Sequence, residues 1–180
     1  MKFISILRGI NVSGQKKIKM ADLKSLFETL GFQNVKTYIQ SGNVIFDAIA
    51  KNKSSLKKCI EQAIKEKYQF HVPVEIRTSR ELENVIKRCP FGPVDLVNEG
   101  TKVLVTFLAL PPVQAKISDI QKYVLAPEKL VVSGKEVYLY CPNGYGKSKL
   151  SNTFLEQKLG VDATTRNWKS VHKLYELSLV

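Results

Sequence analysis

Cysteine is scarce in this sequence, and so is histidine. Cys59, Cys89 and Cys141 are far apart, no C-x-x-C pair occurs, and His71 and His172 are the only histidines. An odd and sparse set of cysteines argues against a disulfide framework and against a zinc site. We therefore predict no metal site and no cofactor, and we expect three reduced thiols packed as small hydrophobic groups.

Long apolar runs are also missing. No stretch approaches the ~20 apolar residues that a membrane helix needs. The apolar stretch before Arg8 is too short for the hydrophobic region of a signal peptide. The sequence therefore predicts a cytoplasmic protein with no membrane partner.

Known catalytic motifs are absent as well, because neither G-x-S-x-G nor H-E-x-x-H occurs. Gly146-Lys147-Ser148 resembles the end of a phosphate-binding P-loop. A P-loop needs a glycine five positions before Gly146, where this chain has Cys141. We interpret residues 141–148 as a flexible cationic loop, and the sequence identifies no catalytic residues.

Positive charge is abundant. Lys and Arg number 28 against 16 Asp and Glu, which gives a net charge of +12. Residues 1–95 carry +8 of this charge and residues 96–180 carry +4. A basic surface attracts phosphates, nucleic acids and anionic lipid headgroups, but a lysine-rich soluble surface explains the same number. Charge alone leaves both interpretations open.

Apolar periodicity predicts one order of elements, used twice. Thr78-Ser79-Arg80-Glu81 has the form of a capping box that opens a helix, and Asn167 can cap the last helix. The first half has expected strands at 2–7, 35–39, 44–46 and 72–76, with helices around 23–30, 56–64 and 82–89. The second half has expected strands at 102–110, 130–132, 136–140 and 161–165, with helices around 113–124, 150–159 and 168–175.

The order β-α-β-β-α-β is that of the ferredoxin-like unit. We therefore predict an α+β fold made by tandem duplication of a ferredoxin-like unit, each with an additional C-terminal helix. The first unit is expected at 1–90 and the second at 101–180, with a linker at 91–100, because Pro90-Phe91-Gly92-Pro93 breaks the helical pattern there. Ser41-Gly42 aligns with Ser133-Gly134, although the two halves share few identical residues.

Three segments resemble the signatures of one bacterial family. They are Leu-Arg-Gly-Ile-Asn-Val-Ser-Gly at 7–14, Thr-Tyr-Ile-Gln-Ser-Gly-Asn-Val at 37–44 and Thr-Arg-Asn-Trp at 165–168. On these residues the chain is similar to the domain of unknown function 1697 family, with Ser13 where many members have glycine. The resemblance spans nearly the whole chain in the right order. It implies a duplicated ferredoxin-like fold and no particular activity.

The loop at 8–19 is the first candidate for a binding site. Connections of this kind usually have 2–6 residues, and this one contains two glycines and four cations and precedes a helix, whose N-terminus favours anions. In the predicted topology the hairpin at 40–43 lies at the same edge. The candidate ligand-binding residues are Arg8, Asn11, Gly14, Lys16, Lys17, Gln40, Ser41 and Asn43. Alternatively, the Gly and Asn residues only set turn geometry and the lysines are solvated.

Arg166 is a secondary candidate, as the only arginine after residue 100. It could clamp an anion with two parallel hydrogen bonds or pair with an acidic residue in a structural role. Trp168 beside it is interpreted as a core or interdomain anchor.

Three functions remain open on the sequence. The first is binding of a phosphate-bearing ligand or nucleic acid at the basic edge. The second is an enzyme that acts on a small anionic molecule, and the third is a protein-interaction module. Residues 41–47 lack the basic-glycine-aromatic pattern of RNA-recognition domains, which argues against that subtype. The sequence leaves the oligomeric state open.

Overall fold

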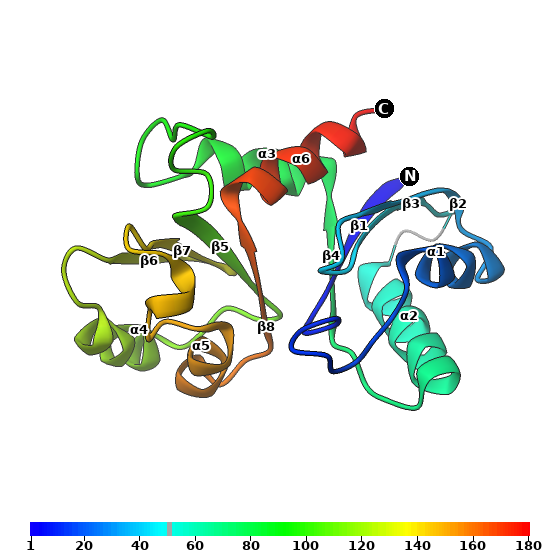
Figure 1. Ribbon diagram of the computed structural model, residues 1–180, viewed down its shortest axis with the longest axis horizontal. Helices are drawn as coiled ribbons and strands as arrows, with labels where there is room; N and C mark the ends of the chain where they lie inside the picture. The colour runs from blue at the N-terminus through cyan, green and yellow to red at the C-terminus, as the bar shows by residue number, and fades with distance from the viewer. Residues whose placement is uncertain (50–51) are drawn as a thin grey trace. The chain divides into compact units, whose positions relative to one another are not determined.

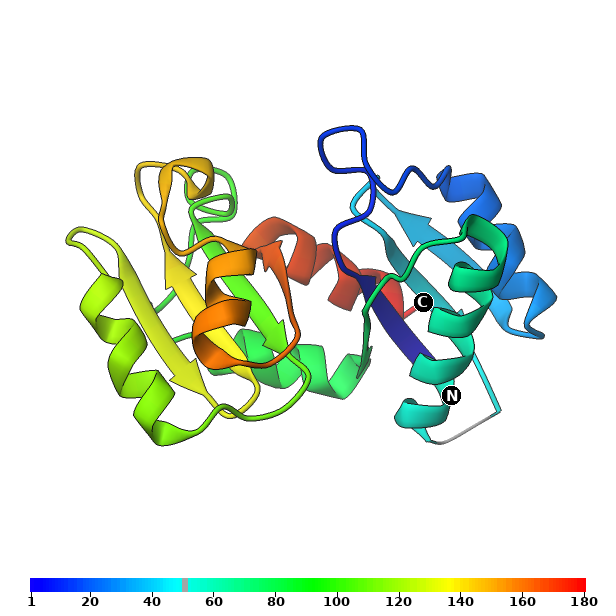
Figure 2. The same cartoon turned by 90° about the horizontal axis from the view of Figure 1, so that it is seen from below.

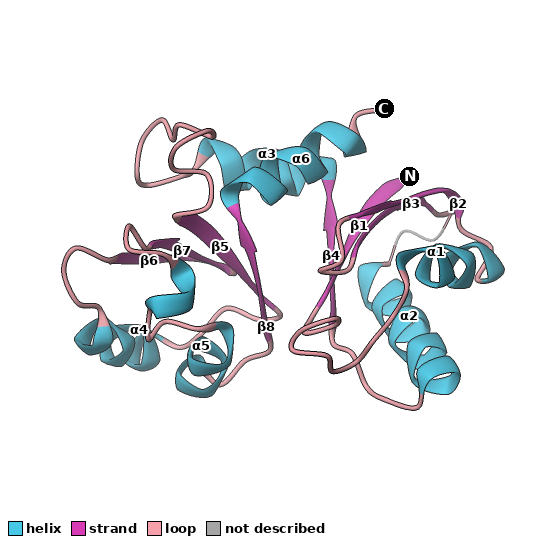
Figure 3. Ribbon diagram, in the orientation of Figure 1, coloured by secondary structure: helices cyan, strands magenta, loops and turns pink. Residues whose placement is uncertain are grey.

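The computed structural model describes residues 1–49 and 52–180. Its elements follow the predicted order twice, as Figures 1 and 3 show. The first series is β1 Lys2–Leu7, α1 Met20–Thr29, β2 Gln33–Tyr38, β3 Asn43–Asp47, α2 Lys53–Tyr68, β4 Val74–Thr78 and α3 Ser79–Lys87. The second is β5 Val103–Leu108, α4 Gln114–Ile120, β6 Lys129–Ser133, β7 Glu136–Tyr140, α5 Asn152–Leu159, β8 Ala163–Asn167 and α6 Trp168–Ser178, with single 3-10 turns η1 Gln121–Tyr123 and η2 Tyr145–Lys147.

The strands form two four-stranded antiparallel sheets with the same connectivity. Their orders are β2-β3-β1-β4 and β6-β7-β5-β8. Corresponding strands also pair at corresponding positions, since Ile4 of β1 pairs with Arg77 of β4 and Val105 of β5 pairs with Arg166 of β8. The protein is thus a mixed α+β molecule whose described residues form two similar units.

Aromatic packing around Phe46 joins the first sheet to its helices. The ring centroid of Phe46 lies 5.9 Å from that of Phe3, 5.3 Å from that of Phe27 and 4.6 Å from that of Phe32. Alternate residues of a strand point to one face, and this face of the sheet carries the buried core that packs against α1 and α2. Aromatic pairs at these separations add to the stabilisation that burial alone provides.

The second sheet uses aliphatic residues for the same purpose and adds a polar chain. Thr106 and Thr165 share a hydrogen bond of 2.7 Å between their hydroxyls, and Thr165 donates to Asn152 Oδ1 at 2.9 Å. These hydrogen bonds provide partners for side chains that would otherwise be unsatisfied polar groups within an apolar layer. The surrounding core contains Leu104, Leu108, Ile120, Leu139, Leu155 and Leu159.

Both helix caps predicted from the sequence are confirmed. In α3 the Glu81 N–H donates to Thr78 Oγ1 at 3.3 Å and the Thr78 N–H donates to Glu81 Oε2 at 2.9 Å. Burial alone would raise the pKa of Glu81, but hydrogen bonds from Lys53 and Thr78 outweigh it and lower that pKa. At α6 the side chain of Asn167 accepts the N–H of Ser170 at 2.9 Å.

The chain divides into two compact units inside α3 and α6. The first unit consists of Met1–Glu83 and Leu174–Val180, and the second of Asn84–Lys173. Within the first unit the Ser79 hydroxyl donates to the carbonyl of Ser178 at 3.2 Å, so the last residues of the chain bond to the start of α3. The predicted limits of the two sequence repeats, 1–90 and 101–180, stay a prediction.

The expected packing of the cysteines is wrong for Cys59. Cys141 is buried and Cys89 is half-buried, whereas Cys59 is exposed. The buried stripe of α2 runs through Leu56, Ile60 and Ile64. Their i, i+4 spacing places Cys59 beside the stripe rather than on it.

We expect the thiols to react with iodoacetamide in the native protein in the order Cys59, Cys89, Cys141. Burial raises the pKa of the Cys89 and Cys141 thiols, which leaves less of the reactive thiolate, and Cys59 is exposed. Peptide mapping by mass spectrometry after timed quenching gives the three rates. In urea-unfolded protein the rates should converge, and native Cys141 reacting as fast as Cys59 would contradict the assignment of burial.

The two hairpin glycines differ in what a side chain would meet. Gly42 has φ of +80°, and a Cβ there would lie 2.6 Å from Ile10 Cδ1 and 2.9 Å from Leu7 Cβ. Gly134 in the second unit has φ of +61°, and its Cβ would meet only Glu136 Oε2 at 4.0 Å. Both positions disfavour other residues, but only Gly42 is also a point of close packing.

We expect Gly134→Ala to destabilise the protein by about 1 kcal/mol through backbone strain. Gly42→Ala adds overpacking of ~1–3 kcal/mol, because Leu7 and Ile10 must move. Urea unfolding of the two variants and the parent measures the difference. Equal losses of stability would show that the contact with Ile10 does not matter.

Candidate functional site

The loop at 8–19 folds into a small projecting hairpin of its own. The N–H of Asn11 donates to the Lys16 carbonyl at 3.2 Å, and the N–H of Gln15 donates to the Val12 carbonyl at 2.9 Å. Ser13 and Gly14 have φ of 49° and 75°, the signs that a type I′ turn requires. Figure 2 shows this blue loop extending beyond the strands of its unit.

Asn11 fastens this hairpin to the rest of the first unit. Its amide group donates to the carbonyls of Ile18 and Gln40, each at 2.9 Å, and its oxygen accepts the N–H of Ile18 at 2.9 Å. One side chain thus joins both ends of the loop to the β2–β3 hairpin. The predicted contact between the loop at 8–19 and the hairpin at 40–43 is present, and the Asn11 side chain makes it.

Asn43 has the same role inside the β2–β3 hairpin. It is fully buried, and its amide donates to the Tyr38 carbonyl and to the Ser41 hydroxyl, each at 3.0 Å. The Gly42 carbonyl accepts the N–H of Leu7 at 2.8 Å. The strand, the loop and the hairpin therefore form one packed edge, which we call the loop–hairpin edge (residues 8–19 and 39–43).

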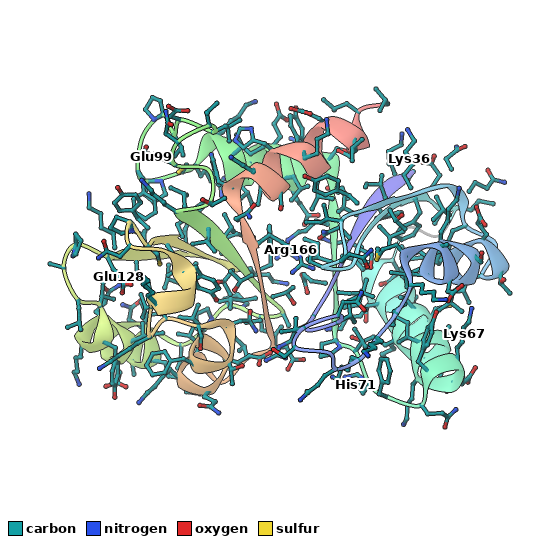
Figure 4. All side chains as sticks on the ribbon, in the orientation of Figure 1. Lys36, Lys67, His71, Glu99, Glu128 and Arg166 are labelled. Carbon is teal, nitrogen blue, oxygen red and sulfur yellow. The ribbon has the colours of Figure 1, made fainter. Side chains whose placement is uncertain are left out.

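The cations of this edge are not equivalent. Lys16 donates through Nζ to the carbonyl of His71 at 2.7 Å, a residue labelled in Figure 4. Arg8 is half-buried, and its backbone N–H donates to the Pro73 carbonyl at 2.9 Å. Lys17 is exposed beside Gly14. Lys16 is therefore partly structural, and Lys17 is the one of these three cations whose side chain is exposed.

Left-handed backbone is concentrated at this edge, and Ile39 is the residue that sequence analysis missed. Among residues 1–49 and 52–180, Asn11, Ser13, Lys16 and Ile39 are four of the six non-glycine residues with positive φ. Ile39 has φ of 50° and is 48% exposed. A β-branched residue with positive φ is strained, and nothing in its residue type predicts that conformation.

Arg166 lies on β8 of the second unit and is 7% exposed. Its Nη1 donates to the carbonyl of Thr165 at 2.9 Å, and burial lowers the pKa of the guanidinium to about 10. Removal from water suits a structural role better than capture of a ligand from solution. Clamping of an anion by Arg166 stays a separate prediction.

The P-loop-like segment at 141–148 has a different local structure from a P-loop. Lys147 lies in the short turn η2, and α5 begins only at Asn152 after its cap Ser151. A P-loop instead leads from its glycines and lysine into an α-helix that points at the phosphates. The described residues also contain no cluster of three or more His, Cys, Asp or Glu that could hold a metal ion, and none of their helices is long and apolar enough to cross a membrane.

The fold is that of a mixed α+β protein with two similar units, and a polar edge lies on the first of them. The chain belongs to the family described as protein of unknown function (DUF1697), whose model matches residues 1–138. This match contains the segments at 7–14 and 37–44, and it ends before the Thr165–Trp168 segment.

A solved structure is similar over the whole chain. It is that of the conserved bacterial protein SP0830 from Streptococcus pneumoniae, with 24% sequence identity, a TM-score of 0.73 and 98% of both chains covered. At this identity the likeness concerns the fold alone. None of the curated proteins compared with the chain matches it significantly.

We expect Asn11→Ala to speed hydrogen exchange at the Ile18 amide by about tenfold, because it removes the acceptor of that N–H. Asn11→Asp is the matched variant, since it keeps the acceptor and loses the two donors. Amide exchange followed by NMR should therefore show protection of Ile18 in Asn11→Asp but not in Asn11→Ala. Unchanged exchange in both variants would mean that Asn11 does not hold the loop.

Proposed function

We propose that the first unit binds a phosphate-bearing ligand or nucleic acid at the loop–hairpin edge. The residues proposed to form the site are those chosen from the sequence, with Asn11 and Asn43 holding its backbone: Arg8, Asn11, Gly14, Lys16, Lys17, Gln40, Ser41 and Asn43. We further propose that both units are ferredoxin-like and that the protein acts in the cytoplasm. The repeated element order β-α-β-β-α-β supports the first of these points.

The main support for the proposal is a comparison of the lengths of corresponding connections in the two units. The connection from β1 to α1 has twelve residues, 8–19, whereas the corresponding connection from β5 to α4 has five, 109–113. The β2–β3 turn has four residues, 39–42, and the β6–β7 turn has two, 134–135. The same scaffold is thus closed by short connections in the second unit, so its strands and helices do not require the longer ones.

The chemistry of the edge suits an anion. Arg8 offers a planar donor that matches phosphate oxygens, and Lys17 adds an exposed positive charge. Gln40 is exposed at the same edge and supplies a neutral polar side chain. The N-terminus of α1 adds less, because Asp22 in its first turn already provides a negative charge.

Two exposed apolar residues favour a second candidate, a protein-interaction surface. Val12 is 58% exposed at the tip of the small hairpin, and Ile39 is 48% exposed on the neighbouring turn. Aliphatic groups beside cations suit an acidic peptide as well as a nucleotide base. The two candidates are distinguished by whether the affinity of the edge for its ligand depends on salt and on a phosphate group.

We expect Arg8→Ala combined with Lys17→Ala to weaken binding of inorganic phosphate and of a labelled single-stranded oligonucleotide. Loss of a charged hydrogen bond is worth about 2 kcal/mol, close to 30-fold in affinity. NMR titration measures phosphate binding and fluorescence anisotropy measures oligonucleotide binding. Affinity of the parent protein for the oligonucleotide should fall as salt rises, because cation–phosphate contacts release counterions.

Lys36→Ala combined with Lys67→Ala is the matched control. It removes the same charge from exposed positions on β2 and α2, outside the edge, and both residues are labelled in Figure 4. Thermal unfolding checks that every variant folds, and Lys17→Glu tests the exposed cation alone. Equal binding by the edge variant and the parent, or equal loss in the control, would refute the proposal.

A further inference from the structure

A pocket lies in the second unit, and none of its lining residues is one that the proposed function uses. Its volume is about 520 Å³, within the range of roughly 300–1,000 Å³ usual for small-molecule sites. Two segments form it, one after η1 and one after β7. The lining residues are Tyr123, Leu125, Ala126, Pro127, Glu128, Asn143, Lys147 and Lys149.

Both segments are longer than the scaffold requires. The connection from β7 to α5 has eleven residues, 141–151, against five, 48–52, between β3 and α2. The connection from η1 to β6 has five residues, 124–128, against three, 30–32, between α1 and β2. The second unit therefore carries extra residues at these two connections, and seven of the eight residues that line the pocket belong to them.

The walls of the pocket are held by the core and by their own turns. The N–H of Glu128 donates to the Leu125 carbonyl at 2.9 Å, and the N–H of Lys147 donates to the Gly144 carbonyl at 3.1 Å. Cys141 and Leu150, at the two ends of the longer segment, are fully buried. The pocket is thus largely formed before any ligand arrives, which limits the entropy lost on binding.

One end of the pocket is the ring of Tyr123, held between Phe154 and one cation, Lys158. The ring of Tyr123 packs edge-on against Phe154 at 5.2 Å, and its hydroxyl accepts a hydrogen bond from Lys158 at 2.7 Å. Lys158 also lies over the Tyr123 ring, with Nζ 4.3 Å from its centroid. An immobilised ring next to a positive charge offers a stacking surface for a flat apolar group.

The charges of the residues that line the pocket decide which charge its ligand should carry. Lys147 and Lys149 are exposed at the pocket, and Glu128 is the one acidic residue among the eight. The balance of the lining is therefore one positive charge, with Lys158 adding another beside Tyr123. A ligand with a single anionic group suits this balance, and Leu125 and Pro127 provide apolar contact for its body.

From these observations we propose that the pocket binds a small organic anion that carries a flat ring. The ring lies against Tyr123, Leu125 and Pro127, and the anionic group is held by Lys147 and Lys149. Asn143 supplies a neutral hydrogen-bonding side chain at the same wall. The ligand is defined by ring and charge together, and carboxylate and phosphate are two sources of that charge.

Benzoate and adenosine 5′-monophosphate are the probes, each titrated into the full chain and followed by backbone NMR. With benzoate we expect shifts confined to the amides of residues 125, 126, 128 and 143–149, since Pro127 has no N–H. Adenosine 5′-monophosphate should shift the same amides, and because it also carries the phosphate proposed to bind the loop–hairpin edge, it is titrated into the Arg8→Ala, Lys17→Ala variant as well. Benzyl alcohol and adenosine have rings without charge, and acetate has charge without a ring, so each should bind at least about fivefold more weakly than its matched probe. Binding of only one of the two anions identifies the preferred anionic group and supports the proposal.

Lys147→Ala combined with Lys149→Ala should lower the affinity for the probe about tenfold, since two exposed charge pairs are lost. Lys116→Ala combined with Lys169→Ala removes the same charge from exposed positions of the same unit and should leave binding unchanged. Leu125→Ser alters a residue that is 58% exposed, so folding is preserved, and it should weaken binding of the ring. At the pocket amides the Arg8→Ala, Lys17→Ala variant should bind both probes as the parent does, whereas any shifts that adenosine 5′-monophosphate causes at the loop–hairpin edge should weaken in this variant.

Several results would overturn this proposal. They are no shift at 125–128 and 143–149 with either probe at about 10 mM, equal affinity for benzoate and benzyl alcohol, and equal weakening by the two lysine double variants. None of these outcomes bears on the loop–hairpin edge, whose test uses inorganic phosphate and an oligonucleotide. The two proposals therefore fail independently.

Discussion

The central strand of each unit has antiparallel neighbours on both sides, and this pairing decides where every connection of the unit emerges. β1 lies between β3 and β4, and β5 lies between β7 and β8. All six residues of β5 are buried, as are five of the six in β1. A strand that is paired on both edges and buried cannot slip by one residue without turning its side chains to the wrong face. The ends of the strands are therefore fixed points for the loops.

The two units use opposite ends of this common sheet for their longer connections. In the first unit the loop–hairpin edge lies where Leu7 ends β1 and Asn43 begins β3. In the second unit the pocket segments adjoin the other end, where Lys129 of β6 pairs with Tyr140 of β7. Each unit thus serves as the reference for the other. A connection that is short in one unit shows what the fold needs, and the excess in the other unit requires a separate explanation.

The sequence predicted most of the scaffold because its signals are local. The helix stripes, the capping box of Thr78 and Glu81, the cap of Asn167 and the contact between the loop and the hairpin all follow from spacing and element order. The exposure of Cys59 was missed because its place at the border of a helix stripe depends on the exact rotation of α2. The division of the chain inside α3 and α6 depends on contacts between distant segments, which periodicity does not contain.

The candidate sites were less accessible from the sequence than the scaffold. The candidate residues of the edge could be chosen by type, but Asn11 and Asn43 turned out to hold the backbone through their amides. Ile39 carries no signal, because isoleucine strongly disfavours the left-handed conformation that it adopts. The pocket of the second unit is formed by two connections that are distant in sequence, and their spatial proximity is not contained in local sequence patterns.

The strain at Ile39 bears on why the edge has this form. A residue in a sparsely populated region of φ and ψ costs about 1–3 kcal/mol and persists only where its surroundings fix it. Here the hydrogen bond from Asn11 to the Gln40 carbonyl and the close packing of Gly42 against Leu7 and Ile10 fix the turn. A turn that only joined two strands would be relieved of this cost by glycine at position 39, or by the two-residue turn that the second unit uses. The longer, strained turn bonded to the cationic loop is therefore better explained by a demand on the shape of this surface than by a demand of the fold.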